Sequence, residues 1–321
     1  MNVFVTRKIP ESGLLMLKNH HSVTINQKNR VLSKDEIIDQ AKDAEGLLCL
    51  LTDKIDEDVI SHLPKLKMIA NYAVGFNNVD VEYATKEKIP VSNTPGILTD
   101  TTAELSWALV FSVARRIVEG DKFCREGKFE GWGPMLMLGQ DISKKTIGIV
   151  GAGRIGTAMA LKSKGFDMNV LYVNPDQNSV LESELNAKKT NLSNLLSQSD
   201  IVSLHVPLTE ETEHLIGEKE LKMMKETAIL VNTSRGPVID EKALIRALEE
   251  NWIFGAGLDV YEQEPVIPEK LKQLDNAVIL PHIGSATKET RSKMAEMAAE
   301  NMITGLKGDH PPNCVNPEVF K

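Results

Sequence analysis

A glycine-punctuated turn is the feature that most constrains how this chain folds. The apolar run Thr146-Ile-Gly-Ile-Val150 leads directly into Gly151, Gly153 and Gly156, which have the G-x-G-x-x-G spacing. In a dinucleotide-binding unit the first glycine allows a tight strand-to-helix turn, the second lets the backbone approach a pyrophosphate, and the third lets the helix pack closely on the strand. The N–H groups at the start of that helix, together with its dipole, then hold the phosphates.

The segments around this turn favour a nucleotide site over a glycine-rich surface loop. Residues 157–164 are typical of a helix, Gly165 is suited to end it, and 169–174 predict a second strand. A surface loop would not follow a β-branched apolar run. We therefore expect a dinucleotide-binding βαβ unit in the middle of the chain.

Length and charge narrow the class of protein. A chain of 321 residues accommodates about two domains, and its net charge of −8 argues against a nucleic-acid or anionic-membrane surface. No apolar run approaches the roughly 20 residues of a membrane span, and no secretory signal is visible, so we expect a cytoplasmic protein. Cys49, Cys124 and Cys314 lack metal-ligand spacing, so we expect reduced thiols and no metal site.

Two sets of short strands alternate with helical segments throughout the chain. The first set is expected over 2–6, 46–51, 67–71 and 90–92, and the second over 146–150, 169–174, 200–206, 227–233, 254–259 and 277–280. Between the early strands lie polar helical segments such as 33–42, where Ser33 and Glu36 form a capping-box signature, and 56–62. Such alternation predicts parallel sheets covered by helices on both faces, so the fold class is α/β.

A long helix and a loop after it suggest extensive apolar contacts. Residues 100–116 predict a helix that is apolar nearly all round between 103 and 114, which is typical of a buried helix. The following segment 129–138 is punctuated by glycine and proline but carries large apolar side chains. It is either a small satellite core or an arm that packs on a partner chain.

Charged side chains follow three of the later strands. Arg235 comes after one strand, Asp259, Glu262 and Glu264 come after the next, and His282 comes after a third. In doubly wound sheets the carboxyl ends of the strands form the ligand-binding edge. Individually each residue has a structural explanation, but together they supply a carboxylate anchor, a proton donor and a carboxylate that orients the donor. We therefore expect a dehydrogenase site for 2-oxo acids at this edge.

Several motifs resemble one family over essentially the whole chain. The chain is similar to the D-isomer-specific 2-hydroxyacid dehydrogenases, and most to their glyoxylate/hydroxypyruvate reductases, through residues 46–53, 74–75, 98–105, the glycine loop, 232–236, 257–260 with 264–265, and 281–287. The resemblance implies two doubly wound parallel-sheet domains. A Rossmann-type cofactor domain, residues 99–285, would be inserted in a flavodoxin-like substrate domain formed by 1–98 and 286–321.

The resemblance also implies roles for individual residues. Arg235, Glu264 and His282 match the catalytic trio, which leaves Glu262 without a role. Substrate contacts are implied for Leu51, Val74, Gly75, Arg235, His282, Ser285 and Trp132. Leu50 would line the pocket together with Leu51, and Trp132 would come from a neighbouring subunit of a homodimer. Cofactor contacts are implied for Thr102, Gly151, Gly153, Arg154, Ile155, Gly156, Asn174, Val206, Pro207, Thr212, Thr233, Ser234, Arg235, Asp259, His282 and Gly284.

The end of the second nucleotide-domain strand departs from the pattern of NAD-specific relatives. Asn174 stands where they carry an acidic residue for the ribose 2′-OH, and no Arg or Lys follows at 175–178. Losing the carboxylate removes repulsion against a 2′-phosphate, while Asp176 would restore some of it. We expect NAD or NADP as cofactor, with a slight lean towards NAD.

The sequence thus favours a homodimeric NAD(P)H-dependent reductase of small 2-oxo acids such as glyoxylate and hydroxypyruvate. Three alternatives remain open: a phosphoglycerate dehydrogenase, a phosphite dehydrogenase, and an NAD-sensing corepressor that binds cofactor without turnover. The preferred acid and the preferred cofactor are not determined by the sequence.

Overall fold

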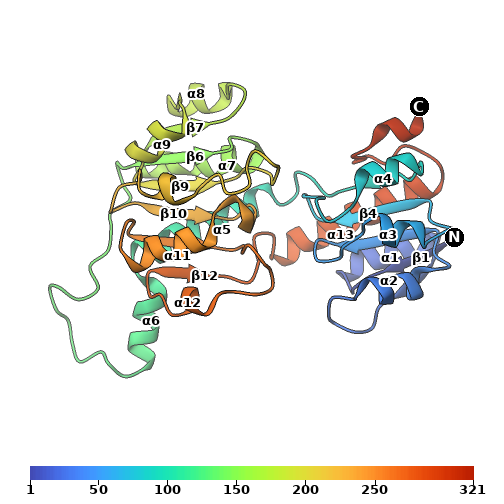
Figure 1. Cartoon of the computed structure of the whole chain (residues 1–321), viewed down its shortest axis with the longest axis horizontal. Helices are drawn as coiled ribbons and strands as arrows, with labels where there is room; N and C mark the ends of the chain where they lie inside the picture. The colour runs from blue at the N-terminus through green and yellow to red at the C-terminus, as the bar shows by residue number, and fades with distance from the viewer. The chain divides into compact units, whose positions relative to one another are not determined.

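The computed structural model describes all residues from Met1 to Lys321. The chain divides into two compact units (Figure 1). Unit 1 consists of Met1–Leu98 and Ser285–Lys321, and unit 2 consists of Thr99–Gly284. Among the helices, none combines the length and apolarity that a membrane-spanning helix requires.

Unit 1 is built on a five-stranded parallel sheet of order β2-β1-β3-β4-β5. Its strands are β1 (Asn2–Val5), β2 (Ser22–Ile25), β3 (Gly46–Leu50), β4 (Met68–Tyr72) and β5 (Val91–Ser92). This is the flavodoxin-like strand order, in which the chain reverses direction across the sheet between β1 and β3. The loops that follow β3 and β4 therefore open at the ligand-binding edge of the unit.

Most of the α-helices of unit 1 begin at polar caps that the sequence supplies. They are α1 (Glu11–His20), α2 (Lys34–Ala41), α3 (Glu57–Ser61), α4 (Val81–Lys86), α13 (Lys288–Leu306) and the 3₁₀ turn η3 (Pro317–Phe320). The expected capping box is present, because the Ser33 hydroxyl accepts from the Glu36 N–H and the Glu36 carboxylate accepts from the Ser33 N–H. Asp56 and Asp80 are simple caps of α3 and α4, since their carboxylates accept from the Val59 and Tyr83 N–H groups.

The C-terminal helix α13 belongs to unit 1 although it follows unit 2 in the sequence. It packs against α1 and β4. At Gly13 of α1 an added Cβ would lie 2.4 Å from the carbonyl oxygen of Ala295, so only glycine lets the two helices approach so closely. Short-range sequence patterns carry no signal for this return, because it depends on contacts between residues far apart in the chain.

Unit 2 contains a seven-stranded parallel sheet of order β12-β11-β10-β9-β6-β7-β8. Its strands are β6 (Thr146–Val150), β7 (Asn169–Val173), β8 (Lys188–Lys189), β9 (Ile201–Leu204), β10 (Ile229–Asn232), β11 (Gly255–Leu258) and β12 (Ala277–Ile279). The strand order reverses between β6 and β9. This is the Rossmann arrangement, whose dinucleotide crevice lies at that reversal.

Helices cover both faces of the unit 2 sheet. The helices are α5 (Thr99–Ala114), α6 (Ile117–Arg125), α7 (Arg154–Lys162), α8 (Ser179–Leu185), α9 (Leu192–Gln198), α10 (Glu218–Leu221), α11 (Glu241–Glu249) and α12 (Glu269–Lys272), with 3₁₀ turns η1 (Ser163–Phe166) and η2 (Gly236–Val238). Side chains of α5, α7 and α8 share one buried cluster, and those of α9 to α12 share another. The expected buried helix is α5, which packs against α7, β10 and β11.

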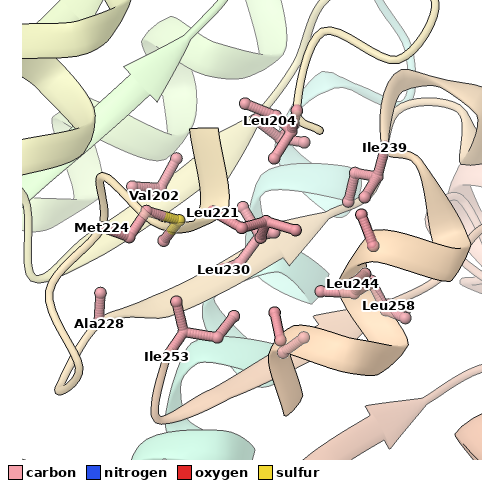
Figure 2. Packing of buried hydrophobic residues seen from close by; sticks show 14 of the residues in the cluster. Val202, Leu204, Leu221, Met224, Ala228, Leu230, Ile239, Leu244, Ile253 and Leu258 are labelled. Carbon is pink, nitrogen blue, oxygen red and sulfur yellow. The ribbon is translucent and has the colours of Figure 1, made fainter. Parts of the chain in front are cut away.

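The second cluster fixes the strands that carry the charged residues. Figure 2 shows Val202 of β9 and Leu230 of β10 beside Leu221 of α10 and Leu244 of α11. All four side chains are fully or almost fully buried. Replacing a leucine in such a position by alanine costs about 2–5 kcal/mol of stability, so the strand ends above this cluster are held firmly.

Some of the observed elements differ from the expected ones. The strands β2 and β8 were not predicted, because β2 is half exposed and β8 is a lysine pair without an apolar pattern. The helix α7 begins at Arg154 rather than at residue 157. Gly165 does not end it: the residue lies inside η1, and Asp167 takes the left-handed conformation, with φ of 52°.

Candidate functional site

The glycine loop between β6 and α7 has the geometry of a phosphate cradle. Gly151 has φ of +94°, and a Cβ there would lie 2.8 Å from the backbone of His205 and Val206. A Cβ on Gly156 would lie 2.1 Å from the Gly151 carbonyl oxygen. Both glycines are therefore required by close backbone contacts.

The remaining glycine of the loop faces open space. A Cβ on Gly153 would meet no atom within 4 Å, and Gly153 caps α7 without a side-chain hydrogen bond. The N–H groups in the first turn of α7, from Arg154 and Ile155 onward, are thus available to an anion at the positive end of the helix. These residues fit a pyrophosphate group.

The turn after β7 is tied to this loop. The Asn178 side-chain amide donates to the Ala152 carbonyl oxygen at 3.0 Å and to Thr157 Oγ1 at 2.7 Å. Asn174, at the end of β7, donates from its side-chain amide to the Asp176 carbonyl oxygen at 3.1 Å. The strand end just before Asn174 lies beside the loop, because the Gly151 N–H donates to the Val173 carbonyl oxygen at 2.9 Å, and the contact of Asn174 with a ribose stays a prediction.

The loop after β9 carries three residues predicted to contact the cofactor. Thr212 Oγ1 donates to the Pro207 carbonyl oxygen at 2.6 Å and accepts from the Thr209 N–H at 2.8 Å, so the loop is internally braced. Val206 follows His205, whose backbone touches Gly151. His205 Nε2 lies 2.8 Å from Ser203 Oγ, and burial lowers the pKa of His205 to about 3. His205 is therefore neutral at pH 7.

Two of the three predicted catalytic residues form a hydrogen bond. His282, which follows β12, has its Nδ1 2.9 Å from Glu264 Oε2, and Glu264 follows β11. Oε1 of the same carboxylate accepts from the Tyr261 N–H at 3.1 Å. Glu264 therefore holds the imidazole through Nδ1, which leaves Nε2 to exchange a proton with a ligand.

Charge interactions keep Glu264 ionised. Burial by itself raises the pKa of this carboxyl, but the hydrogen bond and charge of His282, the Tyr261 N–H and the charge of Arg235 together bring the pKa below its ordinary value. Burial lowers the pKa of the Arg235 guanidinium, and the charge of Glu264 opposes this effect. Arg235 Nη1 donates to the Ser234 carbonyl oxygen at 2.6 Å.

A buried carboxylate shapes the backbone around His282. Both oxygens of Asp259 accept backbone N–H groups, from Ile283 and from Gly284, each at 2.7 Å. His282 has φ of +54°, in the left-handed region that residues other than glycine rarely adopt. The Asp259 hydrogen bonds hold the chain in this conformation and thereby aim the imidazole.

Two threonines predicted to contact the cofactor lie near this carboxylate and its loop. Thr102 of α5 donates to the Gly284 carbonyl oxygen at 3.2 Å, and Thr233 Oγ1 lies 2.8 Å from Ser106 Oγ. These bonds connect the buried helix α5 to the ends of β10 and β12. The contacts of Thr102 and Thr233 with a cofactor stay predictions.

A second histidine–carboxylate pair was missed by sequence analysis. His214 Nε2 lies 2.7 Å from Glu262 Oε1, and the His214 N–H donates to the Pro237 carbonyl oxygen at 2.8 Å. Gly236 packs directly on the Tyr261–Glu262 backbone, where a Cβ would lie 1.9 Å away. His214 therefore ties the loop after β9 to the loops that carry Arg235 and Glu264. The signal in the sequence was only a lone histidine in a polar loop.

In unit 1, three consecutive carbonyl groups of the loop after β4 accept hydrogen bonds from buried residues. The carbonyl oxygens of Ala73, Val74 and Gly75 accept from the Thr94 N–H at 2.8 Å, from the Asn93 side chain at 2.7 Å and from the Asn71 side chain at 2.9 Å. In a trans peptide the N–H points opposite to the C=O. The N–H groups of Val74, Gly75 and the next residue thus point away from these buried partners.

The other residues predicted to contact substrate are placed as follows. Leu50 and Leu51 end β3 and enter the loop after it, and the Leu50 N–H donates to the buried Asp53 carboxylate at 2.7 Å. The Ser285 carbonyl oxygen accepts from Arg291 Nε at 3.3 Å at the start of the segment that leads into α13.

The segment between α6 and β6 does not form a core within the chain. Figure 1 shows it as a long loop that extends from α6 away from the sheet of its own unit. Trp132 is 84% exposed, and Phe129, Met135 and Leu138 are also exposed. The satellite-core interpretation is therefore wrong for the isolated chain.

Comparison with known proteins decides the family. Residues 107–284 match the model of the D-isomer specific 2-hydroxyacid dehydrogenase NAD-binding domain. A glyoxylate reductase of Korarchaeum cryptofilum is 54% identical over 321 residues, covering 99% of this chain and 97% of the relative. The chain belongs to the D-isomer-specific 2-hydroxyacid dehydrogenases.

Solved structures agree with the family. An NADPH-dependent glyoxylate/hydroxypyruvate reductase of Sinorhizobium meliloti, in complex with NADP and malonate, is 27% identical with a TM-score of 0.89, covering 100% of this chain and 98% of that one. A D-lactate dehydrogenase of Aquifex aeolicus, complexed with NAD and lactic acid, is 28% identical with a TM-score of 0.86, covering 98% and 99%.

Membership in the family confirms several expectations. This 2-hydroxyacid dehydrogenase is an NAD(P)-dependent enzyme, its cofactor is NAD or NADP, and its fold is α/β with a Rossmann-type nucleotide unit. A small 2-oxo acid is its class of substrate. The roles of the individual site residues and the assignment of the two units as substrate and cofactor domains stay predictions.

Proposed function

We propose that the enzyme reduces glyoxylate and hydroxypyruvate to the corresponding 2-hydroxy acids with NADH or NADPH. The observation that carries the proposal is the Glu264–His282 hydrogen bond at 2.9 Å, beside the loop that supplies Arg235. The similar proteins whose names state this activity support it, among them the Korarchaeum and Sinorhizobium reductases.

Two groups of donors suit the substrate acid. The N–H groups of Val74 and Gly75, which point away from the buried Asn93 and Asn71 side chains, would bind the carboxylate. Arg235 would contact the carboxylate and the carbonyl oxygen through its planar guanidinium, which stays charged even where burial lowers its pKa. Leu51, Ser285 and the partner copy's tryptophan arm would enclose the remainder of the substrate.

His282 would act as the proton donor. The imidazole would hold a proton on Nε2 and give it to the carbonyl oxygen as negative charge develops there. Glu264 orients the imidazole by accepting from Nδ1. The cofactor, when bound, supplies the hydride.

The glycine loop is the part of unit 2 that would hold that cofactor. Gly151, Gly153 and Gly156 with Arg154 and Ile155 would bind the pyrophosphate, Asn174 the ribose, and Val206, Pro207 and Thr212 the adenine side. The nicotinamide is expected beside Thr233, Ser234, Asp259 and Gly284, which follow strand ends, and beside Thr102 of α5, which donates to the Gly284 carbonyl oxygen.

The exposed arm favours a homodimer. Phe129, Trp132, Met135 and Leu138 form an apolar surface on a loop of one chain, and such surfaces are typical of interfaces. We propose that the arm packs on a second copy of this chain in the cytoplasm. Light scattering of the wild type and of Trp132→Ser tests this: a wild-type monomer would contradict it.

A steady-state panel tests the proposed activity. Glyoxylate, hydroxypyruvate, pyruvate and 3-phosphohydroxypyruvate are each offered with NADH and with NADPH. The proposal predicts the highest kcat/KM for glyoxylate or hydroxypyruvate. A preference for the phosphorylated acid would indicate a phosphoglycerate dehydrogenase instead, and cofactor binding without turnover would indicate a corepressor-like protein. Turnover of phosphite with NAD would indicate a phosphite dehydrogenase.

A further inference from the structure

The short strand β8 brings a lysine to the ribose end of β7. Lys189 pairs in parallel register with Tyr172, two residues before Asn174. Its ammonium group donates to the Pro175 carbonyl oxygen, in the turn directly after Asn174. The sequence between 175 and 178 carries no cation, so the lysine is supplied by a different segment of the chain.

Lys189 lies on the same face of the sheet as the cofactor loop. Side chains paired in register on parallel strands share a face, and so do residues two apart on one strand. Lys189, Tyr172 and Asn174 therefore share a face. Tyr172 packs in the buried cluster that contains Met159 and Ala160 of α7, so this is the face that α7 covers.

The turn that Lys189 contacts is joined to the phosphate cradle. Asn178 in this turn donates to Ala152 and Thr157, at the loop and in the first turns of α7. A dinucleotide seated on the cradle extends its adenosine ribose towards the end of β7, where its 2′ position meets the residue at 174. Lys189 therefore contacts the turn that directly follows the residue expected to meet the 2′ substituent.

We propose that Lys189 is a specificity-determining residue that binds the ribose 2′-phosphate of NADP(H). The proposal rests on cofactor binding at the glycine loop. Asn174 contributes no charge against the phosphate, and the Lys189 ammonium is bound to a neutral carbonyl oxygen rather than to a carboxylate. A phosphate therefore gains a charge-assisted hydrogen bond without first displacing an ion pair.

The neighbouring Asp176 opposes Lys189. Its exposed carboxylate lies in the same turn and repels a 2′-phosphate. Lys189 attracts the 2′-phosphate and Asp176 repels it. An enzyme with both charges accepts NAD(H) and NADP(H) and excludes neither. Asn174→Asp, which restores a carboxylate at the strand end, would shift the preference towards NADH.

The test compares Lys189→Gln with Lys188→Gln. Lys188 is the adjacent residue of β8, equally exposed, and its side chain points to the opposite face of the sheet. Dissociation constants of NADH and NADPH are measured by fluorescence titration of the whole enzyme. Lys189→Gln is expected to weaken NADPH about tenfold and to leave NADH within about twofold, whereas Lys188→Gln changes neither.

Two further measurements sharpen the result. Lys189→Arg keeps the charge and is expected to retain NADPH affinity. Added KCl is expected to weaken NADPH more than NADH in the wild type, and this difference should be smaller in Lys189→Gln. The proposal is overturned if Lys189→Gln affects NADH and NADPH alike, if the Lys188 variant behaves the same, or if neither cofactor binds. Because binding is measured without substrate, an enzyme that fails to reduce glyoxylate would still give a decisive answer.

Discussion

His282 Nδ1 lies 2.9 Å from Glu264 Oε2, although the two residues follow different strands and are 18 positions apart. The Asp259 carboxylate fixes the backbone after His282, and the Tyr261 N–H fixes the other oxygen of Glu264. Both partners of the pair are thus held by the protein before any ligand arrives. Such preorganisation is what a proton donor needs.

Replacing Glu264 tests the pair. Burial raises the pKa of Glu264, but the hydrogen bond and charge of His282, the Tyr261 N–H and the charge of Arg235 together lower it, so the carboxylate stays ionised beside the imidazole. Glu264→Gln keeps the shape but removes this charge and the acceptor for Nδ1, so kcat/KM for glyoxylate at pH 7 is expected to fall about tenfold or more while NADH affinity changes little. Equal kcat/KM in wild type and variant would show that Glu264 does not act on His282.

Replacing Arg235 tests substrate anchoring. Arg235→Ala is expected to lower kcat/KM for glyoxylate by on the order of 10²–10³, because one guanidinium contacts both the acid and its carbonyl oxygen. Arg235→Lys keeps the charge but lacks the planar fork and should recover only part of the loss. NADH affinity, followed by fluorescence, should change little. A large loss of NADH binding with an unchanged KM for glyoxylate would contradict this role.

His214 is expected to act as a positioning residue. Its side chain binds Glu262, two residues before Glu264, so His214→Ala should lower kcat at least about fivefold while KM for glyoxylate stays nearly constant. Glu262→Ala should match it, and the double variant should be no worse than either. His214→Gln, which keeps a donor, should recover activity. Additive losses would mean that the two side chains act independently.

The neutral His205 predicts a loss of stability in mild acid. Its pKa is about 3 in the folded protein against an ordinary value of 6.5, so between these values the unfolded chain binds a proton that the folded one does not. The contribution of His205 to the free energy of unfolding is therefore fully present above pH 6.5 and is lost as pH decreases towards 3, by at most ~1.4 kcal/mol per pH unit. In His205→Asn this part of the decrease should vanish. Thermal unfolding of both proteins between pH 5 and 8 measures it.

Much of the nucleotide unit follows from local sequence patterns. The apolar run into Gly151 and the glycine spacing specify a strand, a tight turn and a helix, because each depends on residues close together in the chain. The strand ends that carry Arg235, Glu264 and His282 were predicted for the same reason. Bringing Glu264 and His282 together required the sheet order, which follows from the alternation of strands and helices.

The remaining features depend on contacts that local patterns do not encode. β8 is two exposed lysines that become a strand only because β7 lies beside them, so Lys189 was not recognised as a neighbour of Asn174. The pair of His214 and Glu262 joins residues 48 positions apart. The backbone of His282 is left-handed because Asp259 holds it, and a histidine in a strand-end loop carries no sign of that conformation.

The central claim is that His282 donates the proton in the reduction of a small 2-oxo acid. The most direct measurement is kcat/KM for glyoxylate with NADH in wild type and in His282→Ala, together with the dissociation constant of NADH for both. We predict measurable wild-type turnover, a decrease on the order of 10²–10⁴ in the variant, and nearly equal NADH affinity. A variant as active as the wild type, or a wild type that binds NADH and reduces none of the four acids, would contradict the account.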